Sequence, residues 1–271
     1  MIPAAVEYRR AASLDEAFAA LADPDARALA GGQSLISVLK LRIVQPTLLV
    51  DIGRLGLSGV ALRDGAVRIG ALTVWGDLAG AKELGRPALA AIAECASVIG
   101  DLQVRNRGTI GGSLAHADPA SDIPATLLAL GASVELRSAG QDRTVPLADF
   151  LLGPFLTALG PAELITEIVV ALPPAGSGSA YVKFEHPASG FALAGAAALV
   201  RADGSRTVAV TGVGARPFLL PDGDPDTELV EEVFGDGFAS EEYRRHVVAV
   251  AAKRAVELAQ VRAEEDEKWQ A

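Results

Sequence analysis

Two glycine-rich turns constrain this chain most strongly, because each lies where an apolar segment runs into a helical one. They read Ala30-Gly31-Gly32-Gln33-Ser34-Leu35 and Thr109-Ile110-Gly111-Gly112-Ser113. Glycines let backbone N–H groups approach an anion with no Cβ in the way, and successive N–H groups form a concave nest for phosphate oxygens. The two turns together could therefore grip the two phosphates of a dinucleotide from opposite sides. Further side-chain donors would come from Gln33, Ser34, Thr109 and Ser113.

The same glycines could equally be plain tight turns, since the chain contains 28 glycines and short glycine motifs are weakly specific. Better-known signatures do not fit. The segment 212–217 lacks the third glycine of a dinucleotide-binding fingerprint, and no glycine precedes Lys-Ser or Lys-Thr as in a P-loop. Ser34 is followed by Leu35 and Ile36, which excludes a nucleophile elbow. From the residues alone, each turn could be either a phosphate-binding nest or a purely structural turn.

Composition limits the class of protein. The 271 residues are enough for one large domain or two modest ones, and half are hydrophobic, which excludes disorder. The net charge of −10 disfavours nucleic acid as a partner, because nucleic-acid binders need a positive field. The N-terminus has no secretory signal, and no apolar window is long enough to span a bilayer. We therefore expect a soluble, cytoplasmic protein without a transmembrane segment.

Metal ligands are sparse. The single cysteine, Cys95, cannot form an internal disulfide, and His116, His186 and His246 lack metal-ligand spacing. We expect neither a zinc site nor an iron–sulfur cluster held by this chain.

Apolar periodicity predicts a helix over residues 14–22 that begins at a capping box, a helix from Pro87 to about 99, and a terminal helix over 240–263. Thr73 is expected to cap a short helix, residues 101–108 to form a polar turn, and residues 264–271 to fray. Asp64-Gly65 predicts a hairpin. Strands are predicted over 48–52, 60–63, 66–69, 133–137, 143–145, 164–172, 181–184, 191–201 and 207–213, with a loop over 217–226.

The segment 173–179 is rich in proline, glycine and serine and is the best linker in the chain. We place a domain boundary there, giving a first domain over 1–175, with subdomains of about 1–56 and 57–175, and a second over 176–271.

A histidine and two carboxylates follow the second glycine turn. Ser113 and His116, with Asp118 or Asp122, could be a hydrolase triad, although triads are assembled in space and not by sequence proximity. Alternatively, Ser121 and Asp122 cap a helix that ends at about residue 131.

The two turns and the residues around them resemble a known family. The similarity is to the FAD-binding medium subunits of molybdenum hydroxylases, the carbon monoxide dehydrogenase and xanthine dehydrogenase family. It is strong in the first turn and in the segment 103–119, which contains the second turn. Further matches are Tyr181-Val182-Lys183-Phe184, Pro187-Ala188-Ser189-Gly190-Phe191-Ala192 and residues 240–246. The likeness preserves their order along the chain.

The resemblance implies an α+β fold: an FAD-binding domain of two subdomains, of the PCMH or vanillyl-alcohol-oxidase type, then a smaller α+β C-terminal domain. It implies that both turns hold the FAD pyrophosphate. By the same likeness Asp122 contacts the cofactor, Ile165 or Leu164 lies beside the flavin ring, Lys183 is a basic residue near it, and Ile99 packs against it.

The implied function is electron transfer. FAD in this chain would take electrons from [2Fe-2S] clusters of a small subunit, which serves a large molybdopterin-binding subunit, and pass them to NAD+, a quinone or another acceptor. The expected assembly is a heterotrimer or a dimer of heterotrimers, with no catalytic side chain in this subunit. Residues 217–238 look short beside the family region. The alternative is a non-catalytic module that keeps the fold and binds another nucleotide or none.

Overall fold

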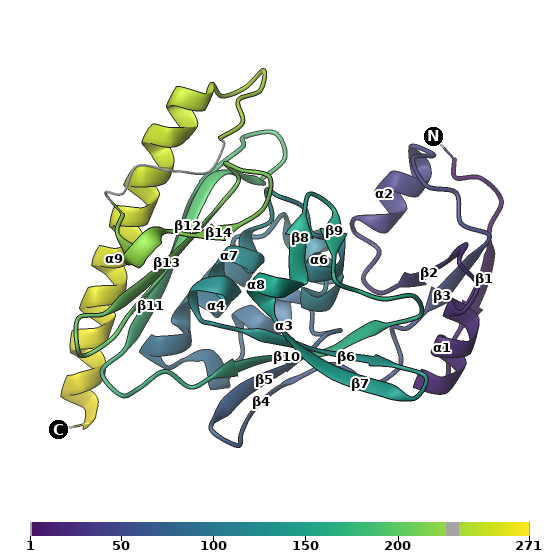
Figure 1. The fold of residues 1–271 in the computed structure, drawn as a ribbon, viewed down its shortest axis with the longest axis horizontal. Helices are drawn as coiled ribbons and strands as arrows, with labels where there is room; N and C mark the ends of the chain where they lie inside the picture. The colour runs from purple at the N-terminus through teal and green to yellow at the C-terminus, as the bar shows by residue number, and fades with distance from the viewer. Residues whose placement is uncertain (1, 226–232, 271) are drawn as a thin grey trace.

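In the computed structural model, which describes residues 2–225 and 233–270, the chain forms three sheets of three or more strands, with helices packed between and beside them (Figure 1). The N-terminal sheet is parallel, with strand order β1-β3-β2, and α1 packs on it through Phe18 above Val50. Its elements are β1 (Glu7–Arg10), α1 (Leu14–Leu21), β2 (Ala26–Leu29), α2 (Leu35–Lys40) and β3 (Leu48–Asp51).

Helix α1 begins where the capping box predicts. The hydroxyl of Ser13 accepts the amide of Glu16 at 3.2 Å, and the Glu16 carboxylate accepts the amide of Ala12 at 2.8 Å. The first bond satisfies an otherwise unpaired N–H group of the first turn, and the second engages the amide of the residue before the N-cap.

The central sheet is antiparallel, with strand order β4-β5-β10-β6-β7. Asp64 and Gly65, at φ 54° and 70°, make the predicted tight turn between β4 and β5. Buried residues of the sheet share one core with a group of helices, as Ile69, Ile92 and Ile123 illustrate. The strands are β4 (Val60–Arg63), β5 (Ala66–Gly70), β6 (Ser133–Ser138), β7 (Gln141–Pro146) and β10 (Leu164–Ala171), beside the short hairpin β8 (Leu151–Gly153) and β9 (Leu156–Thr157).

Two local predictions in this region are wrong. Thr73 does not cap a helix: α3 begins one residue after Val74, and the Thr73 hydroxyl donates to the Gly70 carbonyl at 2.6 Å. Residues 101–108 are not only a turn, because Asp101 caps the short helix α5. The helices are α3 (Trp75–Ala79), η1 (Lys82–Leu84), η2 (Pro87–Leu89), α4 (Ala90–Ser97), α5 (Leu102–Arg105), α6 (Ile110–His116), α7 (Asp122–Ala129) and α8 (Leu147–Phe150).

The C-terminal sheet is antiparallel, in the order β11-β12-β13-β14, and forms a middle layer. Helix α9 runs along one face, while α4 and α7 contact β11 and β12 from the other (Figure 1). Strand β12 is mostly alanine, and such small side chains let helices approach both faces. The elements are β11 (Gly178–Glu185), β12 (Ala192–Val200), β13 (Arg206–Thr211), β14 (Phe218–Leu219), η3 (Pro221–Gly223) and α9 (Glu241–Gln270).

The predicted α+β class is confirmed. Helix α9 continues to Gln270, past the predicted end at about residue 263, and Ala271 lies outside the described residues. The predicted fraying of residues 264–271 stays a prediction. Of the segment 217–238, residues 226–232 also lie outside them. The boundary near residue 176 stays a prediction.

Across residues 2–225 and 233–270, no helix has the length and apolarity needed to cross a membrane.

Candidate cofactor site

The structure brings the two glycine turns together. A Cβ added at Gly31 would lie 2.0 Å from the Arg107 carbonyl oxygen, so the first turn touches the backbone that leads into the second. A Cβ at Gly112 would lie 3.9 Å from the Cβ of Ala30. Only glycine permits the approach at position 31, because any side chain there would overlap main-chain atoms.

The first turn presents backbone donors. Gly32 has φ +76°, and the carbonyls of Gly32 and Ser34 accept the amides that start α2. The amide N–H groups of Gly31, Gly32, Gln33 and Ser34 donate to no atom of residues 2–225 and 233–270. Four successive unengaged donors fit an anion such as a pyrophosphate, because each would otherwise hydrogen-bond only to water.

The second turn uses its amides within the protein. Gly111 donates to the Ala71 carbonyl at 2.8 Å and Ile110 to the Thr73 carbonyl at 3.1 Å. Thr109 caps α6: its hydroxyl accepts the amide of Gly112 at 3.2 Å, and its carbonyl accepts that of Ser113 at 3.0 Å. Only the Thr109 amide finds no acceptor among the described residues of this turn. The second turn therefore serves mainly to start α6, and it offers few free amides for binding an anion.

Steric contact explains the first glycine of this pair. A Cβ at Gly111 would lie 2.6 Å from the Cβ of Ala71 and 2.7 Å from its carbonyl oxygen. Helix α6 thus begins in direct contact with the end of β5, and the glycine serves that contact.

Asp122 and Lys183 form a buried pair. Asp122 is the first residue of α7, and its carboxylate accepts the hydroxyl of Tyr181 and lies 3.4 Å from the Lys183 ammonium. The side chains of Lys183 and Asp122 are 6% and 5% exposed. Burial raises the pKa of Asp122, although Lys183 and Tyr181 oppose the shift. The predicted capping role of Asp122 is wrong, because its side chain is directed to β11.

Lys183 also binds main chain. Its ammonium donates to the Gly190 carbonyl at 2.7 Å and to the Val98 carbonyl at 2.9 Å. Val98 is the C-cap of α4 and immediately precedes Ile99. The pair therefore connects the C-terminal sheet to the loop that precedes the second glycine turn.

Tyr181 is a site residue that the sequence reasoning did not select. Burial, followed by the nearby charge of Asp122, raises its pKa well above the usual range, so the hydroxyl stays a donor. The available signal was its position two residues before Lys183, since alternate residues of a strand share a face.

The two apolar residues expected at the flavin ring lie in different surroundings. Ile99 is partly buried against the central core, and its carbonyl accepts a hydrogen bond from Arg105 at 3.2 Å. Ile165 is 6% exposed and lies at a bulge in the pairing of β10 with β6. Leu164, the other residue considered, is buried in the N-terminal core.

No hydrolase triad is assembled from the described residues. Ser113 hydrogen-bonds to the Ser121 hydroxyl at 2.8 Å, and the His116 ring lies 5.1 Å from the Phe155 ring. Asp118 accepts the amide of Ala120. The Ser113–Ser121 bond instead connects the second turn to the start of α7, where Ser121 makes no capping hydrogen bond.

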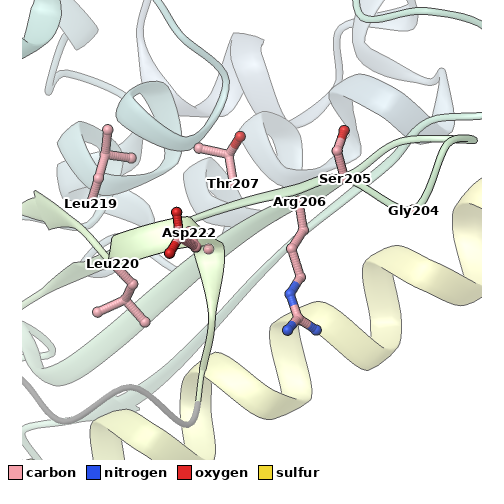
Figure 2. Close-up of a pocket in the computed structure, with 8 residues that line it drawn as sticks. Gly204, Ser205, Arg206, Thr207, Leu219, Leu220 and Asp222 are labelled. Atoms are coloured by element: carbon pink, nitrogen blue, oxygen red, sulfur yellow. The ribbon is translucent and has the colours of Figure 1, made fainter.

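A separate surface pocket lies on the C-terminal sheet (Figure 2). Figure 2 shows the Arg206 side chain directed from β13 toward α9, with Asp222 and Leu220 to its left in this view. None of the residues predicted to bind a cofactor lines this pocket.

Comparison with known sequences gives consistent matches. A sequence family described as the FAD binding domain in molybdopterin dehydrogenase matches residues 4–173. The carbon monoxide dehydrogenase medium chain of Afipia carboxidovorans is 35% identical over 287 residues, covering 97% of this chain and 99% of that protein. The 6-hydroxypseudooxynicotine dehydrogenase complex subunit alpha of Paenarthrobacter nicotinovorans is 42% identical over 206 residues, covering 75% of this chain and 69% of that protein.

The fold matches solved structures as well. A chain of the crystal structure of the Cu,Mo-CO dehydrogenase in its cyanide-inactivated form superposes with a TM-score of 0.90 at 35% identity, covering 97% of this chain and 100% of that chain.

Proposed function

The chain belongs to the family of FAD binding domains in molybdopterin dehydrogenases, and from this membership we propose that it is the FAD-carrying electron-transfer subunit of a multi-subunit molybdenum hydroxylase. It is an oxidoreductase subunit whose cofactor is FAD. When bound, FAD would supply the redox chemistry that links [2Fe-2S] clusters on a partner subunit to an external electron acceptor. The protein supplies binding and electrostatics.

One observation carries the assignment of the cofactor site. The amides of residues 31–34 are unengaged within the described chain and lie beside the second turn, which adds the Thr109 amide. We assign the FAD pyrophosphate to these donors. The second turn contributes mainly by holding Thr109 and the first turn in place.

The side chains predicted for the flavin ring have complementary roles. Ile99 and Ile165 offer apolar surface, and Lys183 offers a positive charge whose orientation Asp122 and Tyr181 hold. A positive charge near the ring stabilises negative charge added there. Because Lys183 is nearly buried, this interaction is weakly screened by solvent.

The relatives' names support an assembly of several subunits. The Afipia and Paenarthrobacter proteins are a medium chain and a complex subunit. We propose that this chain assembles in the cytoplasm with a large molybdopterin-binding subunit and a small [2Fe-2S] subunit, as a heterotrimer or a dimer of heterotrimers.

A flavin titration tests the assignment. Chain purified in native buffer should show flavin absorption or take up FAD saturably, and FMN should not replace FAD, because FMN lacks the pyrophosphate bridge. If the isolated chain takes up none, the titration is repeated on the complex purified through a tag on this chain. A complex without FAD that also fails to bind it would overturn the proposal in favour of a non-catalytic module.

A further inference from the structure

Residues 98–100, which we call the ring segment, accept hydrogen bonds from two cationic side chains at all three of their carbonyls. The Lys183 ammonium donates to the first carbonyl at 2.9 Å. Nη1 of Arg105 donates to the second, that of Ile99, at 3.2 Å, and to the third at 2.7 Å. Because each bond restricts the backbone conformations open to the loop, together they fix the place of Ile99, the residue assigned to the flavin ring.

The ring segment also turns sharply at its last residue. Gly100 has φ +53°, a left-handed conformation that glycine adopts without strain. A Cβ at this position would lie 2.9 Å from the Cβ of Val104. Asp101 then starts α5 by accepting the Val104 amide at 2.8 Å. The ring segment is therefore folded back onto α5.

Helix α5 is too short to hold this arrangement by itself. It has four residues, and a helix of that length does not persist in water without contacts to the rest of the protein. Arg105 is its last residue, and the side chain reaches back past the N-cap to the ring segment. The two bonds from Arg105 therefore join the ends of a short loop that contains Ile99.

The C-terminal end of α5 leads to the turns assigned to the pyrophosphate. The amides of Arg107 and Gly108 donate to the Val104 carbonyl at 3.1 and 2.7 Å. A Cβ at Gly31 would lie 2.0 Å from the Arg107 carbonyl oxygen, so this segment touches the first glycine turn. Arg105 thus connects the part of the chain assigned to the flavin ring with the part assigned to the phosphates.

The contacts of Arg105 distinguish it from its neighbour Arg107. Within residues 2–225 and 233–270, the Arg105 guanidinium makes no ion pair, and its hydrogen bonds go to the ring segment alone. The Arg107 side chain is exposed and makes neither a hydrogen bond nor an ion pair with the same residues. Both cations can attract an anionic cofactor, but only Arg105 holds the ring segment.

We propose that Arg105 is a positioning residue for the flavin, which fixes the ring segment relative to the two glycine turns. The inference rests on the proposed function. One FAD molecule must meet Ile99 with its ring while its pyrophosphate meets the first turn. Contacts that are already in place before binding give higher affinity, because less conformational entropy is lost when the ligand binds. Without Arg105 both parts of the site would remain, but their relative position would vary.

Three variants of the full-length chain test this role. Arg105→Met removes both bonds to the ring segment together with one charge. Gly100→Ala distorts the ring segment and leaves the charge unchanged. Arg107→Met is the matched control, because it removes one charge from the same loop and no side-chain bond among the described residues. FAD is titrated into each FAD-free chain, or into the complex purified through a tag on this chain if the isolated chain takes up none.

Two readouts are expected to change together. Arg105→Met and Gly100→Ala should each raise the Kd for FAD by about tenfold, the effect of about one net hydrogen bond. Both should also blur the vibrational fine structure of the flavin band in the difference spectrum on FAD addition, because apolar contact resolves that structure and water blurs it. Arg107→Met should keep the fine structure.

Several results would overturn the proposal. One is an unchanged Kd and spectrum in Arg105→Met, and another is an equal loss of fine structure in Arg107→Met. An effect of Arg105→Met without any effect of Gly100→Ala would assign the role to charge instead of position. Circular dichroism of the FAD-free variants checks folding, and if Arg105→Met does not fold, Gly100→Ala is compared with Arg107→Met on the same two readouts.

The unsubstituted chain separates this inference from the proposed function. If it takes up FAD and the three variants behave alike, only the role of Arg105 is refuted. If neither the unsubstituted chain nor its complex contains or binds FAD, the function on which the inference rests is refuted.

Discussion

The two glycine turns share a sequence pattern but differ in what their backbone does. In the first, the amides of residues 31–34 are unengaged within the described chain. In the second, the amides of residues 110–113 are bound by Ala71, Thr73 and Thr109. A pair of glycines thus marks a close backbone approach, but it does not say whether a ligand or the protein itself approaches.

Position in the fold explains the difference. The first turn precedes α2, in which only Leu39 is buried. The second precedes α6, whose residues Ile110 and Leu114 are in the central core. Buried amides must find partners, so the second turn meets protein carbonyls, while the first can keep its donors for a ligand.

The largest effect should come from the first turn. Gly31→Ala places a Cβ 2.0 Å from the Arg107 carbonyl and should separate the two turns. Losing two hydrogen bonds to a charged phosphate should cost about 3 kcal/mol, or about a hundredfold in FAD affinity. Fluorescence titration with FAD measures it. Gly153→Ala is the control, since nothing lies within 4 Å of its added Cβ. Equal affinity in both variants would contradict the assignment.

The second turn should respond mainly through stability. Gly111→Ala forces a methyl group against Ala71 in the core, and such overpacking costs about 1–3 kcal/mol. Urea unfolding of the chain without FAD measures the loss, again beside Gly153→Ala. If Gly111→Ala lowered FAD affinity more than Gly31→Ala while leaving stability intact, the roles of the two turns would have to be exchanged.

The hydroxyls of the two turns sharpen the comparison. Thr109→Val removes a helix cap and should cost about 1 kcal/mol of unfolding free energy. Ser34 makes no side-chain capping bond, so Ser34→Ala should leave the unfolding free energy of the FAD-free chain unchanged. Thermal unfolding of both variants decides this. A destabilisation by Ser34→Ala equal to that of Thr109→Val would show that the turns are alike.

The smallest measurable loss is expected at the link between the second turn and α7. Ser113→Ala removes the hydrogen bond to Ser121, a partly buried neutral pair, and should cost about 0.5 kcal/mol. Urea unfolding against the unsubstituted chain measures it. A loss above that of Thr109→Val would mean that this link, not the cap, holds the turn.

Local chemistry made much of the fold predictable. The capping box at Ser13, the Asp64-Gly65 turn and the apolar runs of β10 and β12 depend on neighbours in the chain, and all appear in the structure. The prediction for Thr73 is wrong because a threonine hydroxyl can cap a helix or stabilise a turn equally well. In the structure it donates to the carbonyls of Gly70 and Gly59, which stabilises the turn.

The side-chain roles at the site were less predictable. Asp122 has the residue type and position of a helix cap. Its carboxylate instead accepts hydrogen bonds from Tyr181 and Lys183, about 60 residues later in the chain. Its partners lie on β11, whose place against α7 depends on the packing of Tyr181 into the central core.

The sequence by itself determined most of the elements, the α+β class and the family, because periodicity, turn residues and motif order are local properties of the chain. Only the tertiary structure decided which amides stay unengaged and which carboxylate meets which cation. Those outcomes depend on contacts between distant segments, such as Gly31 with Arg107 and Gly111 with Ala71. A hydrogen-bond donor is available to a ligand only when no protein acceptor reaches it, and that is a property of the packed molecule.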